Sequence, residues 1–316
     1  MSRDQIIKIG MVICAVVLVC TVIITATGMF GSSGIGGYAD AGKYTAGAAE
    51  ITGTVRNLDI NWTSGKVTVA YRTGSTVTLE ESAKRALNDT EKMRWWLDGE
   101  TLRVQFAASG THWNMPEKEL TVTLPEGISL GKAAIRTTSG DMDIPALRAE
   151  DLELSSTSGD ITAAAETPKA SAASTSGDVR IRLAADAESA ALSSTSGSIR
   201  LEAGKAGSIS ASCTSGGISI TAAEAGSVTA GSTSGNIDIA LGKMEKLAVK
   251  ATSGSVSAKL PETPGFTASL EMTSGSLTSS LAMAKDGKQY TCGDGSAKVS
   301  IGTTSGNIRI DAYTAE

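Results

Sequence analysis

The stretch 218–239 reads ISITAAEAGSVTAGSTSGNIDI, and it contains one complete copy of the unit that decides the fold. Apolar residues occupy alternate positions on both sides of a Thr-Ser-Gly tripeptide: Val228 and Ala230 precede it, and Ile237 and Ile239 follow it. Alternation with a period of two is typical of a β-strand that buries one face. The unit therefore predicts two short strands joined by a turn.

The tripeptide occurs ten times, and we interpret its glycines as structural turn residues: Gly65, Gly140, Gly159, Gly177, Gly197, Gly216, Gly235, Gly254, Gly275 and Gly306. From Gly140 to Gly275 successive glycines are 18 to 21 residues apart, and the same alternating apolar positions flank each one. One such unit cannot bury its own apolar face, so copies must stack strand upon strand. The sequence predicts an all-β chain, a β-solenoid of two-strand rungs about 19 residues long.

The turn itself has a chemical explanation. A glycine can adopt the positive φ that a tight turn requires, and the hydroxyl groups before it can satisfy nearby backbone groups. The position three residues before the glycine is reserved for small residues, and Cys213 occupies it in one copy. We expect Cys213 to be a small buried thiol that replaces serine, with a catalytic or disulfide role as the alternative.

Residues 50–131 are expected to form an N-terminal β cap that includes the first repeat. All four tryptophans fall in this part, where a solenoid needs its first open edge covered. Met93 to Phe106 predicts a hairpin about Asp98-Gly99, and Leu120 to Leu124 predicts a further strand that Pro125 ends. Residues 132–316 are then the solenoid repeat domain.

The N-terminus predicts a membrane anchor. Residues 9–30 carry no charge and are long enough for a helix that crosses the bilayer. Basic residues precede this run and none follows until Lys43, so residues 1–8 should be a cytoplasmic tail. Residues 31–49 are rich in Gly, Ala and Ser and predict a flexible linker. We expect a single-pass protein of the cell membrane with its repeats outside the cytoplasm; a cleaved signal peptide is the alternative.

Composition narrows the classes of function. The net charge is −5 and there is no long basic run, so a nucleic-acid partner is not expected. The only histidine, His112, lies in a polar stretch of the cap, where a surface or packing role is the simpler interpretation. The rungs are nearly uniform, whereas a solenoid enzyme acting on glycans needs convergent carboxylates. We expect no catalytic residue, metal or cofactor.

Three features could carry binding. Asp141, Asp160 and Asp178 follow the turn glycine, as asparagine does in two other copies. We interpret them as side chains whose hydrogen bonds support the turn, with a calcium ladder as the alternative. The Thr-Ser pairs could form a regular hydroxyl face. The insertion at 276–303 suggests a surface loop, and Lys285, Asp286 and Tyr290 are its possible contact residues.

The chain resembles the bacterial putative-adhesin family of β-strand-repeat, membrane-anchored envelope proteins. The resemblance covers Ile51 to Ile310 and rests on the segment LDINWTSGKV at 58–67, the strand VTLP at 122–125, and the Thr-Ser-Gly-Asp-Ile-like repeats. It implies surface adhesion without fixing a ligand, and some relatives are associated with envelope stress systems. We therefore expect a non-enzymatic envelope protein that binds wall polymers or other envelope proteins. The alternatives are an accessory or sensor of a cell-envelope stress response and, third, a glycan-processing solenoid enzyme.

Overall fold

The computed structural model describes residues 37–110 and 114–314, which form one sheet of 22 strands and a short 3-10 helix, η1 (Ala41–Lys43). The N-terminal strands are β1 (Thr45–Ala46), β2 (Ala49–Ile51), β3 (Asn57–Arg72), β4 (Val77–Ala83), β5 (Arg94–Asp98), β6 (Thr101–Gln105) and β7 (Lys118–Pro125). The middle strands are β8 (Leu130–Ser156), β9 (Ile161–Glu166), β10 (Lys169–Ser174), β11 (Val179–Leu183), β12 (Ala187–Ser196), β13 (Ile199–Ser215), β14 (Ile218–Ser234) and β15 (Ile237–Ser253). The last are β16 (Val256–Leu260), β17 (Gly265–Ser274), β18 (Leu277–Ser279), β19 (Ala284–Asp286), β20 (Gln289–Gly293), β21 (Ala297–Ser305) and β22 (Ile308–Ala312).

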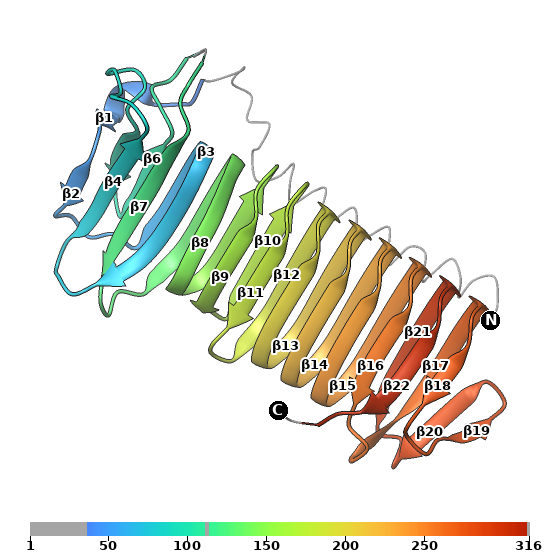
Figure 1. Ribbon diagram of the computed structural model, residues 1–316. Coiled ribbons are helices and arrows are strands. Elements are labelled where there is room, and N and C mark those ends of the chain that lie inside the picture. Colours follow the sequence, from blue (N-terminus) through green and yellow to red (C-terminus); the bar gives the residue numbers. More distant parts are fainter. Residues whose placement is uncertain (1–36, 111–113, 315–316) are drawn as a thin grey trace.

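The strands stack as parallel rungs of a rod (Figure 1). The pairing between β13 and β14 sets Ile199 opposite Ile218 and Ile209 opposite Val228, and the pairing between β14 and β15 continues the same register. Each apolar side chain therefore lies above its equivalent in the next rung. The prediction of an all-β solenoid is confirmed.

The interior of the middle of the rod is packed with aliphatic side chains. The inward positions are aliphatic, and most are almost fully inaccessible to solvent, as Ile220 and Ile237 illustrate at 1% and 0% exposure. Outward positions on the same strands are exposed or half-buried, as expected for a strand with one buried face. In these middle rungs the surface available to a ligand is therefore the outer one.

The first rung of the rod is not the first in the sequence. Strand β3 lies between β8 on one side and β6 with β7 on the other, so β6 and β7 form the outermost parallel rung. Antiparallel strands then cover this end: β5 pairs with β6, β4 with β7, β2 with β4 and β1 with β5. The expected hairpin is present, but its two-residue loop is Gly99 and Glu100, one position later than expected.

At the opposite end the copies are also stacked, but not in chain order. Strands β21 and β22 insert between the rung of β15 and β16 and the rung of β17 and β18. The copy that contains Gly306 therefore precedes the copy that contains Gly275 in space. The tripeptide glycines and the β6–β7 rung give eleven stacked positions, which at about 4.8 Å each make a rod roughly 50 Å long.

A buried lysine closes the N-terminal end of the core. Lys118 is 1% exposed, and its ammonium group lies 2.9 Å from the carboxylate of Glu81 and donates to the carbonyls of Glu91 and Phe106. It also lies over the rings of Trp62 and Phe106, 5.0 and 4.3 Å from their centroids. These contacts satisfy the charge in a site from which water is excluded.

The expected membrane helix at 9–30 lies outside the described residues, as do the tail before it and residues 31–36 of the expected linker. The remaining linker residues, 37–49, are ordered rather than flexible: they contain η1, β1 and the first residue of β2, and β1 pairs with β5. Within residues 37–110 and 114–314, no helix combines the length and hydropathy needed to cross a membrane.

Candidate binding surfaces

The turn glycines line up along one edge of the rod because each rung packs directly against the glycine of the next. A Cβ atom built on Gly140 would lie 2.6 Å from the carbonyl oxygen of Gly65, and every later glycine of the tripeptide faces the carbonyl of the glycine on the adjacent rung even more closely. Real Cβ contacts are essentially never shorter than 3.0 Å. Close approach between rungs is therefore the requirement that all ten glycines share.

The expected positive φ is found at only four of these glycines, namely Gly65, Gly216, Gly275 and Gly306. At the other six glycines φ does not lie in the positive range that favours glycine, so residues other than glycine could adopt the same backbone conformation. Steric access for the neighbouring rung therefore explains the glycine more generally than turn geometry does.

The small residue three positions before the glycine connects one rung to the next. The hydroxyl of Ser194 donates to the carbonyl of Gly177 at 3.2 Å, and the thiol of Cys213 donates to the carbonyl of Gly197 at 3.1 Å. Thr303 donates to Gly254, which follows the spatial order of the rungs. Cys213 is 6% exposed and free, and burial raises the pKa of its thiol.

The acidic residues after the glycine also connect rungs. One carboxylate oxygen of Asp141 accepts the backbone N–H of Asp160 at 2.9 Å, and Asp160 and Asp178 do the same for the next rung at 2.8 Å. Asn236 and Asn307 accept equivalent bonds. In the described part of the chain, no three His, Cys, Asp or Glu side chains gather as a metal site would require. The observed contacts are those of turn support, carried from rung to rung.

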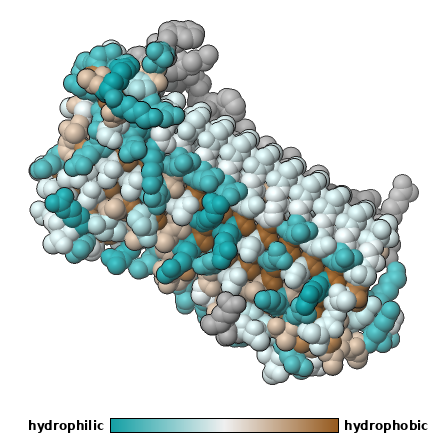
Figure 2. Space-filling model, viewed as in Figure 1, coloured by the Kyte–Doolittle hydropathy of each residue, from teal (hydrophilic) through white to brown (hydrophobic). Residues whose placement is uncertain are grey.

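The hydroxyl edge, formed by the Thr-Ser pairs before the ten glycines, runs along the rod. The nine serines from Ser139 onward are exposed, and Ser64 is half-buried. Pairing of Ser215 with Ser234 and of Ser234 with Ser253 shows that they form a continuous row. Figure 2 shows rows of pale side chains repeating along the rod, with hydrophilic side chains gathered over its N-terminal end.

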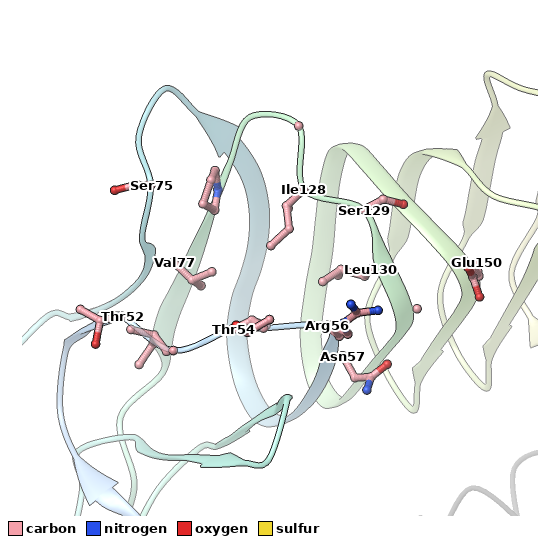
Figure 3. A pocket seen from close by; sticks show the side chains of 16 residues that line it. Thr52, Thr54, Arg56, Asn57, Ser75, Val77, Ile128, Ser129, Leu130 and Glu150 are labelled. Atoms are coloured by element: carbon pink, nitrogen blue, oxygen red, sulfur yellow. The ribbon is translucent and has the colours of Figure 1, made fainter.

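Among the described residues, recesses include a small one of about 270 Å³ beside Met272 and Ile301 at the C-terminal end, and two larger ones. The first of the two larger recesses, which we call the junction groove, has a volume of about 660 Å³ and is lined by Thr52, Thr54, Arg56, Val77, Leu130 and Glu150, among others. Figure 3 shows the threonines and Arg56 along the segment between β2 and β3, facing the loop between β7 and β8. Its floor is apolar, since Val77 and Leu130 are almost fully buried. Arg56 on its rim is 3.3 Å from Glu100.

The second recess, the bulge groove, has a volume of about 560 Å³. Its lining includes Tyr71, Glu126, Arg148, Ala164, Glu166 and Arg182. The groove lies where the pairing of β8 with β9 shifts register between Ile144 and Leu147. Neither recess was expected from the repeat, because both lie where the repeat is irregular.

The insertion at 276–303 is not a plain surface loop. It contains the outermost strand β18, the hairpin of β19 and β20, and most of β21. Lys285 and Tyr290 face each other across the hairpin, with the ammonium 5.4 Å from the ring centroid, and Asp286 pairs with Gln289. The hairpin anchors to the rod because β20 pairs with β17, where Cys292 and Phe266 are both buried.

Some sequence-based candidates fall elsewhere, and some residues were missed. His112 and Trp113 lie outside the described residues. Lys118 was not singled out, although it stands in β7 opposite Gly65, the position that glycine occupies in the other rungs. Arg148 and Arg182 were also missed; the signal that could have indicated their groove is Pro145 within an otherwise regular strand pattern.

The sequence of the chain matches the model of a known protein family. The model of the family described as Toastrack DUF4097 matches residues 55–311. No curated protein matches the chain.

Three crystal structures are similar in part. A Bacteroides fragilis protein described as a "putative adhesin" is 13% identical, with a TM-score of 0.41, and the match covers 85% of this chain and 97% of that one. A Parabacteroides distasonis "putative lipid binding protein" has the same identity and coverages and a TM-score of 0.38. A Clostridium sporogenes "putative cell adhesion protein" is 12% identical, with a TM-score of 0.21 and coverages of 85% and 100%. Since the family model spans most of the chain, the protein belongs to the Toastrack DUF4097 family.

Proposed function

We propose that this protein is a non-enzymatic, membrane-anchored component of the cell envelope whose solenoid binds wall polymers or other envelope proteins. The observation that carries the proposal is the contrast between a filled interior and an ordered exterior. The rungs between the two ends bury their aliphatic side chains, while the hydroxyl edge presents the same two side chains in each Thr-Ser-Gly copy. A rod of this kind offers many equivalent contacts to a long or repetitive partner.

The charged residues of the surface favour binding over catalysis. Several pair with a neighbour on the same strand or on the next rung. Arg200 lies 2.8 Å from Glu202, Lys243 lies 3.1 Å from Glu224, and Arg309 lies 2.6 Å from Asp311. Hydrogen bonds from Lys243 and Arg309 lower the pKa of Glu224 and of Asp311, which does not suit these carboxylates to donate a proton as general acids.

The proposed membrane anchor is the N-terminal segment of the chain. The uncharged run at 9–30 would hold the chain in the membrane, with the solenoid on the outer side. Residues 31–36 would connect this run to the folded cap, which begins with η1 and β1.

The test is a binding experiment with the full chain in detergent micelles. Purified cell-wall material and detergent-solubilised envelope proteins are offered separately, and retention is measured against increasing chain concentration. Saturable binding to either material is the expected result. A chain that binds neither material saturably would contradict the proposal.

A further inference from the structure

The bulge groove lies at one of the places where the solenoid departs from its own repeat. Between β8 and β9, Ile144 pairs with Ala163 and Leu147 with Ala165, so the two residues Pro145 and Ala146 oppose the single residue Ala164 and β8 carries one extra residue. The pairings of β13, β14 and β15 contain no such shift. A bulge that breaks a regular ladder bends the strand and redirects side chains, and bulges concentrate beside functional sites.

One wall of the groove is an aromatic ring held in place. The hydroxyl of Tyr71 donates to the carbonyl of Ile128 at 3.1 Å and accepts the backbone N–H of Arg148 at 2.9 Å. Burial raises the pKa of the Tyr71 hydroxyl, so the ring stays neutral. The guanidinium of Arg148 lies 5.7 Å from the ring centroid and 3.1 Å from the carboxylate of Glu166.

The floor of the groove is made of small side chains. Ala164 is half-buried, and in the parallel register it stands next to Arg182 of the following rung. Because the side chain of Ala164 is short, it leaves space beside the long side chain of Arg182. A volume of about 560 Å³ lies in the range of small-molecule sites, which is roughly 300–1,000 Å³.

The charges of the groove balance. Arg148 and Arg182 face Glu126 and Glu166, two of each sign. Among the described residues no ion pair involves Arg182 or Glu126, and both side chains are exposed. A groove without net charge gives a polyanion no electrostatic advantage. Its arginine and carboxylate groups instead offer planar sets of donors and acceptors that suit adjacent hydroxyls.

From these contacts we infer that the bulge groove binds a segment of a neutral glycan chain. The ring of Tyr71 would lie against the apolar face of a sugar, while Arg182 and Glu126 would hydrogen-bond its hydroxyls. This inference rests on the proposed envelope-binding function and assigns it one site and one class of ligand.

The test uses the full chain in detergent with neutral tetrasaccharides of N-acetylglucosamine and of glucose as probes, and polygalacturonate as the polyanion. Ala164→Trp fills the groove, and Ala240→Trp is its matched control, because Ala240 occupies the same outward register position on β15 and is also half-buried. Calorimetry or ligand-observed NMR measures affinity, and circular dichroism verifies that both variants fold.

We expect the wild type and Ala240→Trp to bind at least one neutral tetrasaccharide with equal affinity, and Ala164→Trp to lose binding by about tenfold or more. Arg182→Ala should weaken binding by roughly tenfold, the effect of removing one charge-assisted hydrogen bond. Binding should depend little on salt, because the ligand carries no charge.

Several results would overturn the inference. Equal binding by wild type and Ala164→Trp, binding of polygalacturonate alone, or no binding of any tetrasaccharide would each reject the glycan groove. If the chain still binds wall material or envelope proteins in those cases, the broader function stands. If it binds none of these, the proposed function fails as well.

Discussion

Replacing Gly235 with alanine tests the packing of the rungs most sharply. The added methyl group would meet the carbonyl oxygen of Gly216 well inside the 3.0 Å limit of real Cβ contacts. The rung cannot simply move aside, because Gly235 donates its N–H to Ser253 at 3.1 Å on the other face. The same carbonyl of Gly216 also accepts the hydroxyl of Ser232 at 3.3 Å.

The expected loss of stability combines two effects. Forcing a methyl group into a packed contact costs about 1–3 kcal/mol, and a lost hydrogen bond costs about 0.5–1.5 kcal/mol more. Gly235→Ala should therefore lower the free energy of unfolding by roughly 2–4 kcal/mol. The matched control is Gly204→Ala, since a Cβ on Gly204 meets nothing within 4 Å. Gly204→Ala reduces only the conformational freedom of the unfolded chain, so its free energy of unfolding should be within about 1 kcal/mol of that of the wild type.

Urea unfolding of the full chain in detergent, followed by circular dichroism at the β-sheet minimum, measures both variants. The urea concentration at the unfolding midpoint should be lower for Gly235→Ala than for the wild type and unchanged for Gly204→Ala. Equal midpoints for the two variants would refute the claim that close approach between rungs requires glycine.

Three further changes follow from the structure. Lys118→Met should destabilise the fold by about 3–5 kcal/mol, because the carboxylate of Glu81 would remain buried without its partner; adding Glu81→Gln should restore part of the loss in urea unfolding. Hydrogen bonds from Arg85 lower the pKa of Glu91 from 4.5 to about 2. The contribution of ionised Glu91 to the free energy of unfolding should therefore be complete above pH 4.5 and be lost as pH falls toward 2. Glu91→Gln should flatten this part of the plot of unfolding free energy against pH. Cys213 should resist alkylation in the folded chain at pH 8 and react once urea unfolds it, as peptide mass spectrometry can resolve, because burial raises the pKa of its thiol.

The solenoid itself could be predicted because two signals agree. The spacing of the tripeptide gives the length of a rung, and the alternation around it gives the inward positions. Val228 and Ile237 illustrate this, since both are predicted inward and both are 0% exposed. The register of the whole middle of the rod follows from these signals.

The two ends could not be predicted from the repeat. A glycine is needed only where another rung presses against the turn, and the outermost β6–β7 rung has no parallel rung beyond it. Lys118 can therefore replace glycine, and this rung lacks the Thr-Ser-Gly tripeptide by which the other rungs are recognised in the sequence. At the other end, equivalent copies stack equally well in either order, so the spacing of Gly275 and Gly306 carries no information on which lies outermost.

The bulge groove escaped prediction for a related reason. A periodic sequence predicts what the rungs share, whereas a groove arises where one rung differs. Pro145 lies at the irregularity, and its lack of an N–H is compatible with a bulge, but the sequence does not place Tyr71 beside it. That contact depends on stacking β3 against β8, 77 residues apart between Tyr71 and Arg148.

The order of the last rungs tests the stacked architecture most directly. Pairs of cysteines are introduced at Ser253, Ser274 and Ser305 in a chain whose own four cysteines are replaced, and disulfide formation under mild oxidation is measured by non-reducing electrophoresis and mass spectrometry. Ser305 pairs with both Ser253 and Ser274. Paired strands bring Cα atoms within disulfide range, whereas two rungs of separation, roughly 10 Å, exceed it. The account predicts that 253–305 and 274–305 crosslink and that 253–274 does not; efficient crosslinking of 253–274 without 253–305 would contradict it.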